Sequence, residues 1–187
     1  LMVFPLLNKK IKSSDVIRNW SIVYFGNFVG SIFIVITMFA TGIYSDGNGD
    51  IGQRTLEIAM GKVDLDFYPA FFRGIMCNIL VCLAIWLTMG AKTIPGKVLG
   101  ILFPITAFVA LGFEHSVANM YFIPAGMMIE NFTTPSFWSL IGMTGSGFES
   151  LNLQTFLIGN LLPVTLGNII GGSFFVGMIY WFVYREE

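Results

Sequence analysis

A histidine next to a glutamate is the feature of this sequence best suited to chemistry. Glu114 and His115 interrupt an otherwise uncharged stretch, residues 98–129, that also contains Pro104 and Pro124. An imidazole, with an ordinary pKa of about 6.5, can give up and recover a proton near neutral pH. Successive residues of a helix point about 100° apart, so the two side chains do not face one lumen. We therefore assign His115 to a proton-exchanging pathway, and Glu114 to anchoring backbone N–H groups where the helix breaks.

Other side chains that could accompany His115 lie at helical spacing from one another. Phe108 is seven residues before His115 and Asn119 is four residues after it, so the three could share one face. Asn78 is the only strongly polar side chain in the middle of its apolar segment, and Val81 follows one turn later. Together these residues predict a narrow, mostly apolar passage that contains an imidazole and two amides.

A lysine precedes the apolar segment that contains Asn78. Lys62 would lie at the outer mouth of the passage, although a lone lysine in a loop is more often only a solvated surface charge. The sequence has no phosphate-binding loop, no hydrolase triad and no His/Cys set with the spacing of a metal site. Cys77 and Cys82, five apart in an apolar run, are expected to be buried thiols. We therefore predict no cofactor and no bound metal.

The composition places these residues in a lipid bilayer. Of 187 residues, 55% are apolar and 11% are charged, whereas a soluble domain carries about 25% charged residues. So few charges could not give a soluble globule an adequate polar surface. The composition excludes a soluble enzyme, a nucleic-acid-binding protein and a secreted disulfide scaffold. It predicts an all-α integral membrane protein.

The uncharged stretches and the loop charges give the membrane segments and their direction. Basic residues dominate the loops at 9–18 and 92–97 and recur at Arg185, whereas acidic residues dominate 46–66 and 130–150. By the positive-inside rule, the basic loops and the C-terminus are cytoplasmic and the acidic loops face outward. The predicted helices of this single transmembrane domain, residues 1–187, are approximately 1–8, 19–42, 69–91, 98–129 (broken near 114) and 154–184.

The stretch 98–129 is too long for one simple span. As a single helix it would be about 48 Å long, against a hydrocarbon core of about 30 Å. An ionisable pair at mid-depth in an overlong segment interrupted by proline is typical of a discontinuous membrane helix. Such breaks survive where protein satisfies the freed backbone groups or where they line a wet cavity. Ionisable side chains at that depth usually mark a pathway.

An internal repeat is visible in the sequence. The string GNFVGS at 26–31 resembles GNIIGG at 167–172, and LMVFP at 1–5 resembles MYFIP at 120–124. The loop charges make these copies run in opposite directions, as in inverted-repeat transport folds. The repeat predicts that the first helix and half of the second are missing from the chain. Small and amide residues at the repeated positions predict close helix packing: Gly26, Asn27, Gly30, Gly167, Asn168 and Gly171.

Three strings resemble signatures of the formate/nitrite transporter family. They are CNILVCLA at 77–84, GFEHSVANM at 112–120 and LPVTLGNIIGG at 162–172, and the resemblance covers essentially the whole chain. It implies an aquaporin-like helical bundle of six helices with an inverted repeat and discontinuous helices. It also implies a multi-pass protein of the inner (cytoplasmic) membrane that assembles as a homopentamer with one pore per protomer.

The resemblance also implies roles for individual residues. His115 resembles the family's central pore histidine, and Asn78 resembles an amide that positions it. Phe108 and Val81 correspond to a hydrophobic constriction, and Lys62 resembles a basic residue of the outer vestibule. The family's pore threonine belongs to a part that this chain does not include.

The implied function is a channel, not an enzyme, for small monovalent anions of weak acids, with formate first and nitrite or hydrosulfide as alternatives. An anion cannot cross an apolar constriction cheaply while charged, but a proton from His115 would let it pass as the neutral acid. One rival is a neutral-solute pore of the aquaporin type, whose half-helices carry Asn-Pro-Ala triplets that this sequence lacks. The other is a membrane enzyme with Glu114 and His115 as an acid/base pair, which their angular offset disfavours.

Overall fold

The computed structural model describes residues 2–184, and every regular element within them is helical. This confirms the all-α class. Leu1 and Arg185 lie outside the described residues. Arg185 contributed to the prediction of a cytoplasmic C-terminus. The elements are α1 (Val3–Leu7), α2 (Ser13–Ala40), the 3₁₀ helix η1 (Ile43–Ser45), α3 (Asp50–Val63), α4 (Phe67–Gly90), α5 (Ile94–Ala110), α6 (Ser116–Phe132), α7 (Pro135–Leu140), the π-helical η2 (Thr155–Leu161), α8 (Leu162–Ile170), the π-helical η3 (Gly171–Met178) and α9 (Ile179–Tyr184).

Three of the described helices are long and apolar enough to cross a membrane. They are α2, α4 and the continuous helix Thr155–Tyr184, which is formed by η2, α8, η3 and α9. Large apolar side chains of α2, such as Phe25 and Phe33, are about two thirds exposed in this single chain. Apolar surface on this scale belongs against lipid or another helix rather than water. The chain is therefore a multi-pass membrane protein.

The acidic segment at 46–66, treated as a loop from the sequence, contains a helix. The helix α3 follows Gly49, whose φ of +86° is in the left-handed region that favours glycine. Its buried residues Leu56, Ala59 and Val63 recur at spacings of three and four. That spacing gives one apolar face for packing and leaves the charged side chains on the other.

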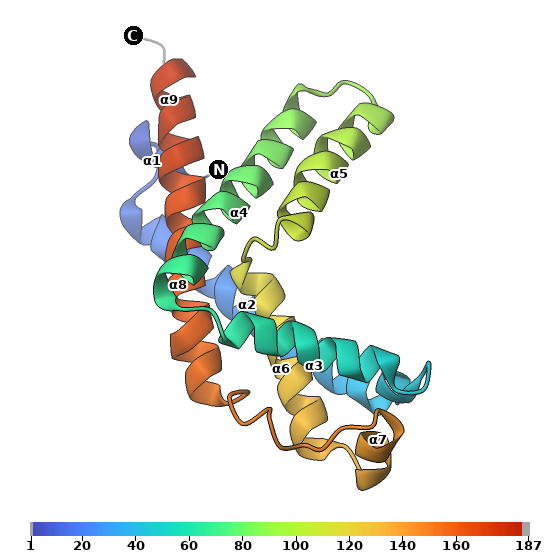
Figure 1. Cartoon of the computed structure of the whole chain (residues 1–187). Helices are drawn as coiled ribbons and strands as arrows, with labels where there is room; N and C mark the ends of the chain where they lie inside the picture. The colour runs from blue at the N-terminus through green and yellow to red at the C-terminus, as the bar shows by residue number, and fades with distance from the viewer. Residues whose placement is uncertain (1, 185–187) are drawn as a thin grey trace. The chain divides into compact units, whose positions relative to one another are not determined.

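The chain divides into two compact units, each described here by itself. The first contains residues 2–23, 68–116 and 163–184 of the described chain, and the second contains 24–67 and 117–162. In the first unit, α4 and α5 form a helical hairpin (Figure 1), with Gly100 of α5 close to Leu87 of α4. Val3 of α1 lies against Gly177 of η3 in the same unit.

Glycines bring α4 and the α8–η3 segment together in the first unit. A Cβ added at Gly167 or Gly171 would overlap the backbone oxygen of Phe71 or Ile75, respectively. Small residues allow this close approach of helix backbones in lipid. In the second unit, a Cβ added at Gly26 or Gly30 would meet no atom within 4 Å. The packing role expected for that pair and for Asn27 stays a prediction.

The hydrophobic core of the second unit is built from α3, α6, α7, η2 and the segment between α7 and η2. Its largest fully buried side chain is Phe156 of η2, which stacks against Phe28 of α2 with ring centroids 6.2 Å apart. The buried core residues are Leu56, Ala59, Val63, Met120, Ile123, Ile129, Phe137, Phe148, Leu151, Phe156 and Leu161. This core fixes α3 against α6 and η2, which matters for the position of Lys62.

Candidate functional site

The broken helix expected at 98–129 is interrupted between α5 and α6. The chain leaves the helical path after Ala110, and Gly112 adopts a φ of +65°. The backbone N–H of Glu114 donates to the carbonyl oxygen of Arg73 on α4, 3.4 Å away. His115 is the residue immediately before α6. The histidine therefore lies at a helix N-terminus, where backbone N–H groups lack partners within the helix.

Asn168 of α8 holds the backbone on both sides of His115. Its Oδ1 accepts a hydrogen bond from the N–H of Ser116 at 2.9 Å. Its Nδ2 donates to the carbonyl oxygen of Glu114 at 2.9 Å and to that of Gly74 at 2.9 Å. Asn168 is only 7% exposed, so these bonds are made where water does not compete freely. One carboxamide thus joins the helix break to α4 and fixes the position of His115.

Asn78 supports this arrangement from α4. Its Nδ2 donates to the main-chain oxygen of Asn168, with the two atoms 2.5 Å apart. A Cβ added at Gly172 would come within 2.6 Å of the same Nδ2, so the small residue at that position leaves room for the amide. The polar side chain in the middle of α4 is therefore connected to His115 through Asn168.

Phe108 and His115 are brought together in the first unit. Their rings are stacked, with centroids 6.1 Å apart and planes inclined by 30°. Both side chains are partly buried. Val81 is partly buried on α4, one turn after Asn78. The spacing of seven residues placed both side chains on one helical face, but α5 ends at Ala110, so the two rings meet across the helix break. Their role in a passage stays a prediction.

From the sequence, Asn168 was assigned to helix packing, and its hydrogen bonds to the backbone at the helix break were not predicted. An amide within an apolar helix could have indicated them, because a buried polar group requires partners. One of the groups that Asn168 binds, the N–H of Ser116, is of the kind that the sequence assigned to Glu114. Glu114 is 3% exposed, and the anchoring role of its carboxylate stays a prediction.

In the second unit, hydrogen bonds connect two buried amide side chains to the main chain of Lys62. Asn119 and Asn160 are fully buried, and Asn119 Nδ2 donates to Asn160 Oδ1 at 2.7 Å. Asn160 Nδ2 donates to the main-chain oxygen of Lys62 at 2.8 Å. The ammonium of Lys62 lies over the ring of Phe122, 5.6 Å from its centroid. Lys62 is thus in the last turn of α3 rather than in a loop, and Asn160 was not identified from the sequence.

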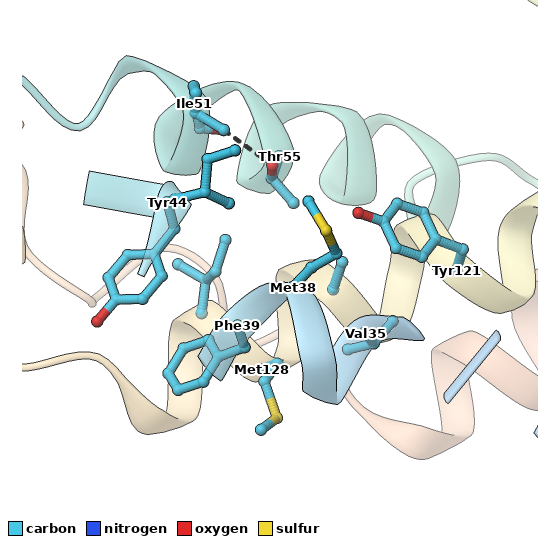
Figure 2. Close-up of a pocket in the computed structure, with 11 residues that line it drawn as sticks. Val35, Met38, Phe39, Tyr44, Ile51, Thr55, Tyr121 and Met128 are labelled. Carbon is cyan, nitrogen blue, oxygen red and sulfur yellow. Dashed lines mark hydrogen bonds between the residues drawn. The ribbon is translucent and has the colours of Figure 1, made fainter. Parts of the chain in front are cut away.

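A separate hollow in the second unit is mostly apolar. Figure 2 shows its walls, where side chains of α2, α3 and α6 converge with Tyr44 of η1. The hydroxyl of Thr55 in this wall donates to the carbonyl oxygen of Ile51 at 2.8 Å. The residues that line it are Val35, Met38, Phe39, Ile43, Tyr44, Ile51, Thr55, Tyr121, Ala125, Met128 and Ile129. None of them is a residue that the sequence assigned to the passage.

Two glutamates beyond the predicted spans differ in their acidity. Partial burial raises the pKa of Glu130, a hydrogen bond from Asn131 opposes this, and the charge of Glu149 adds to it. Hydrogen bonds from backbone N–H groups, including that of Gly147, lower the pKa of Glu149. As pH falls, Glu130 is therefore protonated before Glu149.

The described residues contain no group of three or more His, Cys, Asp or Glu side chains arranged to hold a metal ion. Cys77 is a buried free thiol and Cys82 is a partly buried one.

Comparison with known proteins gives matches over nearly the whole chain. Residues 1–182 match the family described as "Formate/nitrite transporter". The chain is 40% identical over 187 residues to the formate channel FocA of Escherichia coli, covering 100% of this chain and 66% of that protein. It is 43% identical over 169 residues to FocA of Haemophilus influenzae, covering 90% of this chain and 60% of that one. The chain thus spans less than two thirds of the length of these relatives.

Solved structures with the same fold agree with these matches. A pentameric formate channel with formate bound superposes with a TM-score of 0.88 at 44% sequence identity, over 92% of this chain and 68% of that one. An ion channel of the FNT family superposes with a TM-score of 0.77 at 29% identity, over 98% of this chain and 66% of that one.

Proposed function

Since the chain belongs to the formate/nitrite transporter family, we propose that it acts as a channel for small monovalent anions of weak acids, with formate as the first candidate. Its similarity to formate channels at 40% and 43% identity supports this substrate class. The observation that carries the proposal is His115, held at a helix break by Asn168 and stacked on Phe108. A proton carrier beside an apolar ring is what the passage of a weak acid requires.

The passage works by changing the charge of its substrate. Phe108 and Val81 form the apolar constriction, which a bare anion crosses only at a high desolvation cost. A proton from His115 converts the anion to the neutral acid, which crosses at a lower cost. An imidazole recovers its proton readily near neutral pH. Lys62, at the outer mouth, raises the local concentration of anions before this step.

The protein acts in a lipid bilayer as a homopentamer with one pore per protomer. The pentameric assembly of a similar formate channel supports this stoichiometry. The role is transport rather than catalysis. Glu114 is 3% exposed whereas His115 is partly exposed, which favours separate roles for the two side chains over an acid/base pair.

Uptake by liposomes tests the proposed function. The protein expressed from its complete coding sequence is reconstituted, and the uptake of formate, nitrite, hydrosulfide and glycerol is compared under one proton gradient. We expect formate uptake well above that of empty liposomes and glycerol uptake equal to it. Faster nitrite or hydrosulfide uptake would change the substrate, and glycerol uptake without anion uptake would show a neutral-solute pore.

The loop charges give a topology in the inner membrane, with residues 9–18, 92–97 and the C-terminus in the cytoplasm. Asp50 and Lys97 are both exposed and are assigned to opposite sides. In intact cells, a membrane-impermeant maleimide should label Asp50→Cys and leave Lys97→Cys unlabelled until the cells are lysed. The protein without an added cysteine is the control for labelling of Cys77 and Cys82. Labelling of position 97 but not of position 50 would reverse the topology.

A further inference from the structure

Two side chains from other helices contact Lys62 at the end of α3, and a third side chain supports one of them. Asn160 of η2 donates to the main-chain oxygen of Lys62 at 2.8 Å, and Asn119 of α6 donates to Asn160 at 2.7 Å. Phe122 of α6 lies under the ammonium of Lys62, 5.6 Å from it. We call the group of Asn119, Phe122 and Asn160 the Lys62 clamp.

The two amides leave only one orientation for Asn160. A carbonyl oxygen accepts hydrogen bonds and never donates, so the atom of Asn160 that faces Lys62 must be the nitrogen. The oxygen of the same carboxamide then accepts the hydrogen bond from Asn119. Both amides are fully buried, so rotating Asn160 would leave buried groups unsatisfied, which is costly.

Helix geometry explains why this contact controls Lys62. The last four carbonyl groups of a helix have no partner within the helix, and Lys62 lies in the last turn of α3. Asn160 binds one of these carbonyls and so fixes where the helix ends. On α6, Asn119 and Phe122 are three residues apart and lie on neighbouring positions of one face. A Cβ added at Gly126 would overlap that of Ala59, so α6 and α3 are in close contact here.

A ring is a suitable support for a lysine that must attract anions. The face of an aromatic ring attracts a cation but, unlike a carboxylate, does not cancel its net charge. The hydrogen bond from Asn160 restricts the main chain of Lys62, from which its side chain extends. The ring of Phe122 restricts the position of the Lys62 ammonium. The flexible lysine is therefore restricted in position at both ends.

We propose that Asn160 is a positioning residue for Lys62, and that the Lys62 clamp sets the efficiency with which the outer mouth captures anions. This inference rests on the proposed function. It predicts that loss of the clamp weakens uptake at low anion concentration more than the maximal rate, because capture and not passage is affected.

The test is a cycle of variants in the protein expressed from its complete coding sequence. Initial formate uptake is measured against formate concentration for the wild type, Asn160→Ala, Lys62→Met and the double variant, each after the pentamer has been verified by size exclusion. We expect Asn160→Ala and Lys62→Met each to raise the half-saturating concentration by about tenfold. The double variant should resemble Lys62→Met alone. Uptake by both single variants should also depend less on ionic strength than uptake by the wild type.

A second variant keeps the test decisive if Asn160→Ala does not assemble. Phe122→Leu removes the ring but leaves both amides, and we expect a smaller rise in half-saturating concentration that disappears in the Lys62→Met background. If either clamp variant has the same effect with and without Lys62, the proposed positioning role is wrong. If the wild type itself takes up no anion, the proposed function fails instead.

Discussion

Replacing His115 with asparagine is expected to remove the pH dependence of formate uptake while leaving the pentamer assembled. Asparagine keeps a hydrogen-bonding side chain at the start of α6 but cannot carry a proton near neutral pH. Wild-type uptake should fall as pH rises, because the proposed mechanism requires a protonated imidazole. The variant should instead pass anions as a current that changes little with pH. The measurements are uptake into liposomes and current across planar bilayers at several pH values.

The companion variant His115→Phe removes both the hydrogen bond and the proton. Positioned proton transfer typically contributes a factor of 10²–10⁴, so uptake should fall by about a hundredfold or more. If His115 only joins helices, both variants would lower thermal stability and leave selectivity and pH response unchanged. A His115→Asn channel with the wild-type pH profile would show that the imidazole is not the proton donor.

Changing Asn168 to aspartate is expected to have the largest effect on stability. The substitution preserves shape and the acceptor for Ser116 N–H but removes the donors to Gly74 and Glu114. It also places a carboxylate against two carbonyl oxygens in a buried site. Losing a buried hydrogen bond costs about 1–3 kcal/mol, so the two losses together should lower the melting temperature by roughly 4–24 °C. The measurement is thermal unfolding in detergent.

Asn152→Asp is the matched control for this change. Asn152 also donates to a backbone oxygen, that of Glu149 at 3.1 Å, and accepts from the N–H of Thr155, but its side chain is exposed. Exposed substitutions of this kind usually change stability by no more than about 0.5 kcal/mol. Formate uptake by Asn168→Asp should also fall, because the backbone on both sides of His115 is released. Wild-type melting and uptake for Asn168→Asp would show that the hydrogen bonds of Asn168 at the helix break are unnecessary.

The sequence alone determined that lipid surrounds most of the chain, that the fold is all-helical, and where the long membrane helices lie. A charge content less than half that of a soluble domain identifies lipid as the environment. The uncharged runs then give α2, α4 and the helix Thr155–Tyr184, because spanning the bilayer core requires about 20 apolar residues. The pair Glu114 and His115 marked the interruption between α5 and α6, because ionisable groups are costly at that depth. These features depend on composition and on local order along the chain.

The sequence did not reveal α3 within its acidic segment. Its buried residues, among them Leu56, Ala59 and Val63, are separated by charged ones, so no uncharged run marks it. The helix is stabilised by contacts with α6 and η2, which are distant in sequence. Lys62 was for this reason placed in a loop, although it lies in a defined helical turn.

Only the tertiary structure decided which amides are partners. Asn78, Asn119, Asn160 and Asn168 all lie in apolar surroundings in the sequence, and their types alone do not say which groups they bind. The fold directs Asn168 to the backbone beside His115, 52 to 54 residues away in sequence, and Asn160 to Lys62, 98 residues away. The physical reason is that hydrogen bonds act over about 3 Å and in defined directions. The partners therefore depend on how helices distant in sequence pack, which local sequence patterns do not specify.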